Sequence, residues 1–224
     1  MDLRGIIDTA RQRLDDAVAP YHVDDVTLAR FAAEAEREAA IRARLIYDST
    51  TTAITQIAVV PGQHTYPLDS RVDHIDAVSF TRADSLRPRD LDLTGMDSIR
   101  EDCAWHTRSA SRPRKAVHLE PQCSIRIWPT PSQAGTLDLS VYRAPMFDLE
   151  DDDDEPEIPQ RHHDGLVSWI LYRVYSSKDS ELNDDARAGA ALAEFTSRFG
   201  QRDTADVMRR HRERRRVTTR YGGV

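Results

Sequence analysis

Two adjacent histidines, His162 and His163, followed by Asp164, are the residues of this chain whose types most resemble a metal-binding group. Neighbouring side chains on a helix point about 100° apart, so adjacent histidines rarely bind one ion together. The residues that follow at helical spacing, Leu166 and Val167, are apolar and cannot act as ligands. We therefore expect first-turn histidines that hydrogen-bond to nearby backbone or to a neighbouring chain, with no metal and no cofactor.

An acidic run is the second candidate, with eight carboxylates between Asp148 and Glu157. A calcium loop spaces its oxygen ligands and needs a glycine for its turn, and Asp151–Asp154 has neither alternation nor glycine. The run is therefore predicted to be a solvated linker, closed by Pro156 and Pro159. An electrostatic contact with a basic partner is the alternative.

Nucleophiles lack the surroundings that catalysis requires. Ser168 and Ser197 do not lie in a Gly-x-Ser-x-Gly turn, and no carboxylate pair stands out from the general acidity. The two cysteines, Cys103 and Cys123, are too few for a disulfide framework or a zinc site. Free thiols in a reducing compartment are the favoured interpretation over a cross-strand disulfide. The chain is predicted not to be an enzyme.

Arginines dominate the C-terminal end, where the stretch from Arg202 to Arg220 holds eight arginines and three acids. Such a segment can contact phosphates, but only Tyr221 is available for base stacking. It has few apolar residues for a core, so we expect it to be disordered alone and ordered by a partner. Docking onto an acidic protein surface is favoured over an exposed solubilising tail and over direct DNA contact.

Composition restricts the classes of protein further. The 224 residues can form one domain with a sizeable insertion, and 39% apolar with 31% charged residues suits a subunit that completes its burial against partners. A net charge of -7 argues against general nucleic-acid binding. No signal sequence and no apolar stretch of roughly 20 residues is present, so we expect a soluble protein made in the cytosol.

Helical periodicity is found at both ends of the chain. Residues 2–18 predict a short amphipathic helix, and a longer one is predicted to begin at Asp24 or Asp25 with an alanine-rich apolar stripe from Leu28 to Ile46. Its charged face is either solvated or paired with the next subunit of a ring. These candidate inter-subunit residues are Glu34, Arg37, Glu38, Arg42 and Arg44.

Strand patterns replace helical ones in the middle of the chain. Short strands are predicted over 51–60, 64–68, 72–80, 116–120, 124–128 and 136–142, with loop, edge and one short helical turn near Met96. The last two strands alternate apolar and polar residues across a turn containing Pro129, Pro131 and Gly135, which favours an antiparallel hairpin.

Two further helices are predicted over 159–176 and 183–199, with Gly200 as the C-cap. The expected fold is α+β: a four-helix bundle from the N- and C-terminal helices, an inserted antiparallel β-rich module and a disordered basic tail. The expected regions are the N-terminal helices at 1–49, the β-rich module at 50–147 and the acidic linker at 148–158. The helical hairpin at 159–200 and the basic arm at 201–224 complete the chain.

Three segments together resemble phage head-to-tail adaptor proteins of the portal-adaptor, or tail tubular protein A-like, type. The C-terminal helical hairpin of that family is similar to PEIPQRHHDGLVSWILYRVYSSKDSELNDDARAGAALAEFTSRFG, and its second helix is similar to EAEREAAIRARLIYD. The strand, turn and strand before the hairpin resemble SIRIWPTPSQAGTLDLSVYRAP. The order and spacing of these segments are more specific than any one of them.

The resemblance implies a structural virion protein at the head-to-tail junction, assembled in the host cytoplasm. Such proteins form a ring, usually of twelve subunits, that joins the portal protein to a tail or nozzle protein and lines the DNA exit channel. By the same resemblance, the portal-binding residues are Arg209, Arg210, Arg212, Arg214, Arg215, Arg216, Arg220 and Tyr221. A nucleic-acid-binding module that acts through this arginine-rich tail is the alternative.

Overall fold

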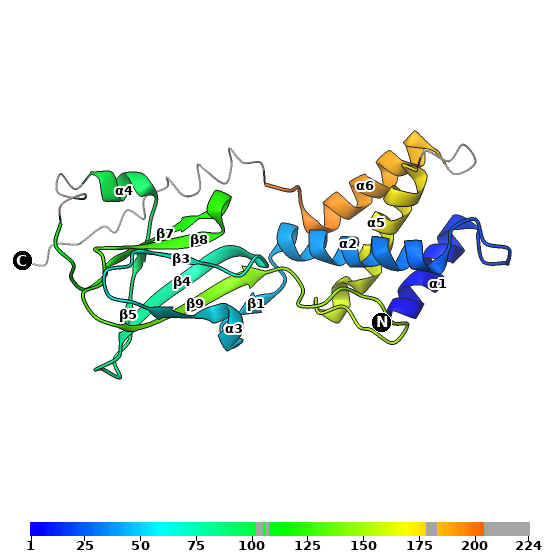
Figure 1. Ribbon diagram of the computed structural model, residues 1–224. Helices are drawn as coiled ribbons and strands as arrows, with labels where there is room; N and C mark the ends of the chain where they lie inside the picture. The colour runs from blue at the N-terminus through cyan, green and yellow to red at the C-terminus, as the bar shows by residue number, and fades with distance from the viewer. Residues whose placement is uncertain (102–104, 106–107, 178–182, 204–224) are drawn as a thin grey trace, which may run out of the picture. The chain divides into compact units, whose positions relative to one another are not determined.

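The computed structural model describes residues 1–101, 105, 108–177 and 183–203, and the chain divides into two compact units (Figure 1). The helical unit comprises Met1–Tyr47 and Tyr142–Arg202, and the β unit contains Asp48–Val141. Helices and mainly antiparallel sheets occur together, which confirms the predicted α+β class. The predicted division into five regions stays a prediction, and residues 204–224 of the basic arm lie outside the described residues.

Four helices form the helical unit: α1 (Leu3–Leu14), α2 (Asp25–Ala43), α5 (His163–Tyr175) and α6 (Asp185–Phe199). The predicted cap of α2 is confirmed, since a carboxylate oxygen of Asp24 accepts a hydrogen bond from the Thr27 backbone N–H at 2.6 Å. The first helix was predicted to reach residue 18, which is wrong. It ends at Leu14, because Asp15 adopts a left-handed conformation (φ 56°), and Val18 is therefore exposed instead of lying on the apolar face.

Helix α5 is the centre of this unit and packs against α6, α2 and α1. The short 3₁₀-helix η2 (Gln160–His162) leads into it. The alanine stripe of α2 is buried as predicted, which lets the helices approach closely. Gly165 of α5 lies against the Phe199 ring of α6, where an added Cβ would be 2.7 Å from the ring. The side chains of Leu28, Ile170 and Phe195 are fully buried in the resulting core.

The β unit contains two sheets. In the first, the strand order is β1 (Tyr47–Asp48), β9 (Gly135–Arg143), β4 (Val72–Arg82) and β5 (Arg89–Asp90), and β2 (Gln56–Val59) also pairs with β9. The second sheet has the order β3 (Thr65–Pro67), β8 (Ser124–Trp128), β7 (Lys115–Leu119) and β6 (Asp92–Leu93). The connections include the short helices α4 (Met96–Arg100) and η1 (Glu120–Gln122).

The predicted hairpin between residues 124–128 and 136–142 is wrong. Strand β8 pairs with β3 and β7, with Ile125 opposite Tyr66, whereas β9 belongs to the other sheet, with Leu137 opposite Ile57. In β8 the half-buried Arg126 lies between the buried Ile125 and Ile127, and β9 alternates half-buried and buried residues from Thr136 to Tyr142, as predicted. Alternation shows that a strand has one buried face but does not identify its partner, so residues 129–134 can connect two sheets as readily as two neighbouring strands.

The predicted strand over 51–60 is only partly correct. It begins with the helical turn α3 (Thr52–Thr55), and only β2 continues as strand. A carboxylate oxygen of Asp48 accepts hydrogen bonds from the backbone N–H groups of Thr50 and Thr51, both at 3.0 Å. These hydrogen bonds hold the chain in a turn before α3, in place of the extended conformation that β-branched residues prefer. The short helical turn predicted near Met96 is confirmed by α4. None of the helices in the described parts of the chain is long and apolar enough to cross a bilayer.

Candidate functional site

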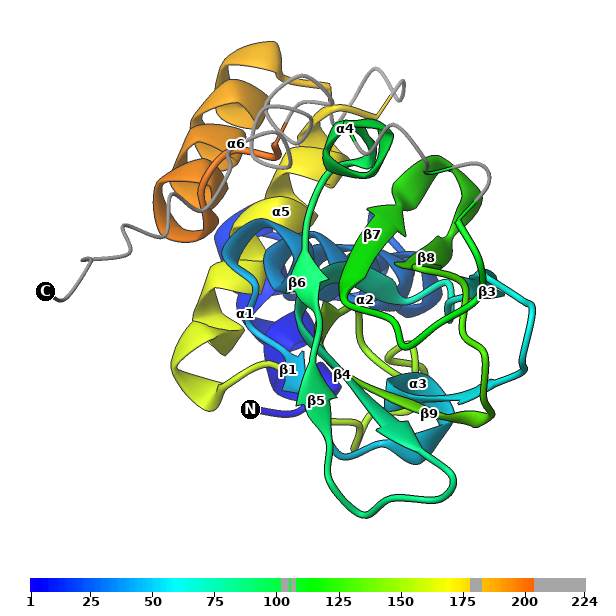
Figure 2. The ribbon, with the colours of Figure 1, turned by 90° about the vertical axis from the view of Figure 1, so that its left-hand side faces the viewer.

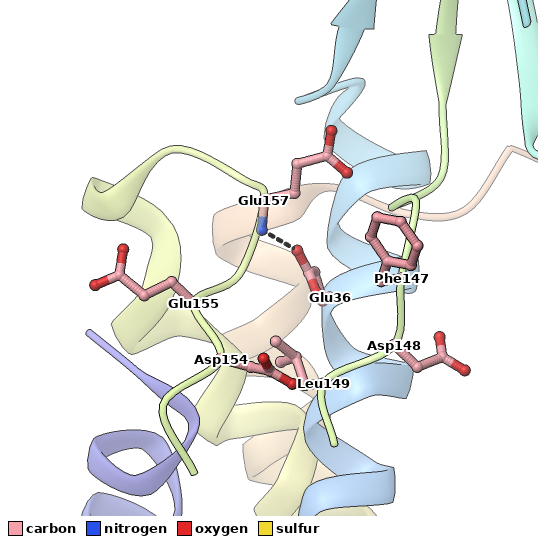
Figure 3. A pocket seen from close by; sticks show the side chains of 7 residues that line it. All are labelled: Glu36, Phe147, Asp148, Leu149, Asp154, Glu155 and Glu157. Carbon is pink, nitrogen blue, oxygen red and sulfur yellow. Dashed lines mark hydrogen bonds between the residues drawn. The ribbon is translucent and has the colours of Figure 1, made fainter. Parts of the chain in front are cut away.

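Glu36 is a buried carboxylate on the helical unit and the centre of the candidate site. It lies on α2 beside the alanine stripe and is only 1% exposed. Its Oε1 accepts a hydrogen bond from the backbone N–H of Glu157 at 2.5 Å (Figure 3). It also accepts a longer one from the backbone N–H of Ile158, at 3.4 Å. The side chain thus holds the end of the acidic run against the helix.

Burial raises the pKa of Glu36 from 4.5 to about 7. The two backbone N–H groups lower the pKa because they stabilise the carboxylate. The neighbouring carboxylates of Glu157 and Asp148 raise it again by repulsion. Glu36 therefore exchanges its proton near neutral pH, where an ordinary glutamate is fully ionised.

A pocket of about 220 Å³ lies beside Glu36 within the helical unit. Figure 3 shows the side chains that line it: Glu36, Phe147, Asp148, Leu149, Asp154, Glu155 and Glu157. Phe147 is 82% exposed, although it is a large apolar residue. Two of the five carboxylates have arginine partners, because Arg37 lies 3.7 Å from Asp148 and Arg143 forms two hydrogen bonds with Glu157.

The acidic run adopts a fixed turn as it passes this pocket. A carboxylate oxygen of Asp154 accepts hydrogen bonds from the backbone N–H groups of Glu150 and Asp151, each at 2.9 Å. These bonds lower the pKa of Asp154. The apolar residues within and after the run, Leu149 and Ile158, are buried in the core of the helical unit. Most carboxylates of the run remain exposed, but its backbone is anchored at both ends.

The two adjacent histidines have different surroundings. His163 is buried, and its Nε2 lies 2.9 Å from the carbonyl oxygen of Ile158, as expected for a histidine that hydrogen-bonds to nearby backbone. The His162 ring contacts Phe199, and burial, with Arg161 and His163 nearby, lowers its pKa. Within the described residues no three His, Cys, Asp or Glu side chains are placed to hold a metal ion. The pocket beside Glu36, in contrast, can attract a cationic group, because five carboxylates line it.

The five residues predicted between subunits lie on α2 or at its end. Four of them form ion pairs inside the helical unit: Glu34 with Arg173 at 3.1 Å, Arg37 with Asp148, and Glu38 with both Arg42 and Arg202 at 2.9 Å. Arg44 ends the helix in a left-handed conformation. A role for these residues between subunits stays a prediction. The predicted portal-binding residues, Arg209 to Arg220 and Tyr221, lie outside the described residues.

Two pocket residues, Glu36 and Phe147, were not singled out from the sequence. A signal for Glu36 was present, because it follows Ala32 by four residues and precedes Ala39 by three, which places it beside the buried stripe. Nothing local distinguishes Phe147. Its exposure depends on how the acidic run returns to α2.

The chain was also compared with known proteins. A search of curated proteins finds no match. The family model described as SU10 adaptor protein matches residues 1–220, which include both units and most of the basic arm. This match confirms the phage head-to-tail adaptor family predicted from the sequence. The chain therefore belongs to the SU10 adaptor protein family and is a structural phage adaptor, a component of the virion.

Proposed function

We propose that this protein is the head-to-tail adaptor that forms a ring under the portal and connects it to the tail or nozzle. The four helices act as one bundle at the level of the portal. The ring has twelve subunits, as in the adaptor family that the sequence resembles, and it lines the DNA exit channel. The observation that carries the proposal is family membership over residues 1–220.

The charge distribution supports this role. The net charge of -7 suits a channel through which DNA must pass without being held. The arginines from Arg209 to Arg220 are separated from the eight acids between Asp148 and Glu157. A ring with heterologous interfaces needs two different complementary surfaces on each subunit, and segregated charges provide them.

The basic arm is proposed to attach the ring to the portal. The test is a chain truncated after Gly200, compared with a full-length chain in which the seven arginines from Arg209 to Arg220 are replaced by glutamine. Both variants should keep the far-UV circular dichroism of the helical unit and lose co-sedimentation with portal rings. Normal attachment of the truncated chain would refute portal docking through the arm.

The same variants test the nucleic-acid-binding alternative. Binding of duplex DNA by the isolated wild-type protein that falls steeply with salt and is lost on truncation supports that alternative. If truncation also leaves portal attachment unchanged, nucleic-acid binding replaces portal docking as the role of the arm.

A further inference from the structure

The loop between β4 and β5 forms a projecting tip on the β unit. The two strands are antiparallel, with Ser79 opposite Asp90 and Phe80 opposite Arg89, and the connecting residues 83–88 extend beyond the paired region (Figure 2). Leu86 is 99% exposed, more than any other large apolar residue that the structure describes. A single exposed leucine needs no explanation by itself, so the surroundings of Leu86 decide whether it has a role.

The conformation of this tip is held by its own hydrogen bonds. The Ser85 N–H donates to the Arg82 carbonyl at 3.0 Å, and the Arg87 N–H donates to the Ser85 hydroxyl at 3.2 Å. The Ala83 N–H also donates to the carbonyl of Ala134, at 3.0 Å. A tip fixed in advance loses little conformational freedom when it enters a partner.

Two exposed guanidinium groups lie beside the exposed leucine. The side chains of Arg87 and Arg89 have no ion pair or hydrogen bond within the described part of the chain. The tip therefore presents one apolar side chain, Leu86, and one unpaired cation, Arg87, and a second unpaired cation, Arg89, follows at the start of β5. Together these side chains suit a partner surface with an apolar wall and excess negative charge.

The pocket beside Glu36 has these properties. Glu36 lines this pocket, and both backbone hydrogen bonds that it accepts, from Glu157 and Ile158, go to its Oε1. A guanidinium group offers five N–H donors and stacks on aromatic rings. Phe147, 82% exposed, supplies such a ring and an apolar contact for a leucine.

We propose that the β4–β5 tip of one copy enters the Glu36 pocket of a second copy, with Leu86 against Phe147 and Arg87 facing the pocket carboxylates. The contact is heterologous, because the surface on one copy differs from the surface on the other, and such contacts form a ring where the rotation between successive copies closes. The inference rests on the proposed function, in which copies of this chain form a ring.

The test is disulfide cross-linking between full-length chains in which Cys103 and Cys123 are replaced by serine. Leu86→Cys protein is mixed with an equal amount of Phe147→Cys protein under mild oxidation. The matched control mixes Leu86→Cys with Ala186→Cys, an exposed position in the first turn of α6. We expect the mixed disulfide to form at least about tenfold faster with Phe147→Cys, and Arg87→Glu to remove most of that difference. Equal rates for the two pairs would overturn the proposal.

A mass measurement of the wild-type protein, alone and with portal rings, separates this proposal from the function on which it rests. A ring without selective cross-linking overturns the tip-to-pocket contact only. Selective cross-linking without a ring supports the contact and overturns the ring. Absence of both overturns both.

Discussion

Glu36→Gln should change how the stability of the helical unit depends on pH. Glutamine has nearly the same shape as glutamate, and its carbonyl oxygen can accept the hydrogen bonds from Glu157 and Ile158. It cannot ionise. The substitution therefore removes the titration of a buried group and keeps the packing of α2 against the acidic run.

The size and sign of the effect follow from the pKa of Glu36, raised from 4.5 to about 7. Between these pH values the folded state holds a proton that the unfolded state has lost, so the free energy of unfolding decreases as pH rises. The stability that comes from protonated Glu36 is fully present below 4.5, the pKa in the unfolded state, and is lost as pH rises through about 7, the pKa in the folded state. One pKa unit corresponds to about 1.4 kcal/mol, so the full shift corresponds to about 3 kcal/mol.

The assay is urea unfolding between about pH 5 and about pH 8, followed by far-UV circular dichroism, because the long helices all belong to the helical unit. Wild type and Glu36→Gln should have similar stability near pH 5, and the variant should be more stable by about 3 kcal/mol near pH 8. The matched control is Glu34→Gln, two residues earlier on α2, whose carboxylate is not buried. A difference between wild type and Glu36→Gln that does not change with pH, or that changes no more than in the control, refutes the reasoning.

Three further substitutions test contacts inside one unit or the other. Gly165→Val should destabilise the helical unit by about 1–3 kcal/mol in urea unfolding, because a Cβ at this position meets the Phe199 ring. The control is Gly189→Val, on the open side of α6, which should lower the free energy of unfolding by less than half as much. Asp16→Ala should cost about 1–3 kcal/mol by the same measurement, because it removes the carboxylate that lies 2.9 Å from the buried guanidinium of Arg11, while Asp25 and the Val23 carbonyl oxygen remain as its partners. No loss of stability would show that the Arg11–Asp16 pair is dispensable. Gly135→Ala should lower the thermal midpoint of the β unit by several degrees, because its Cβ would clash with the backbone carbonyl oxygen of Thr81. Tryptophan fluorescence measures the midpoint, and an unchanged value contradicts the close approach.

Local patterns in the sequence predicted the helices and most strands. The apolar stripe of α2 and its cap at Asp24 depend only on residues three or four apart, so they can be recognised without knowing the rest of the fold. The same holds for the alternation in β8 and β9 and for the separation of acidic and basic segments. The order of these segments was also enough to identify the family.

Only the tertiary structure decided which strands pair and which charges are buried. Strands β8 and β9 are neighbours in sequence but belong to different sheets, because pairing depends on contacts with distant strands such as β3 and β2. The spacing of Glu36 places it beside the apolar stripe, but the backbone N–H group that it binds belongs to Glu157, 121 residues later in the chain. The sequence therefore determines the elements, their exposed and buried faces and the family. The pocket arises from long-range packing between α2 and the acidic run, which no local pattern records.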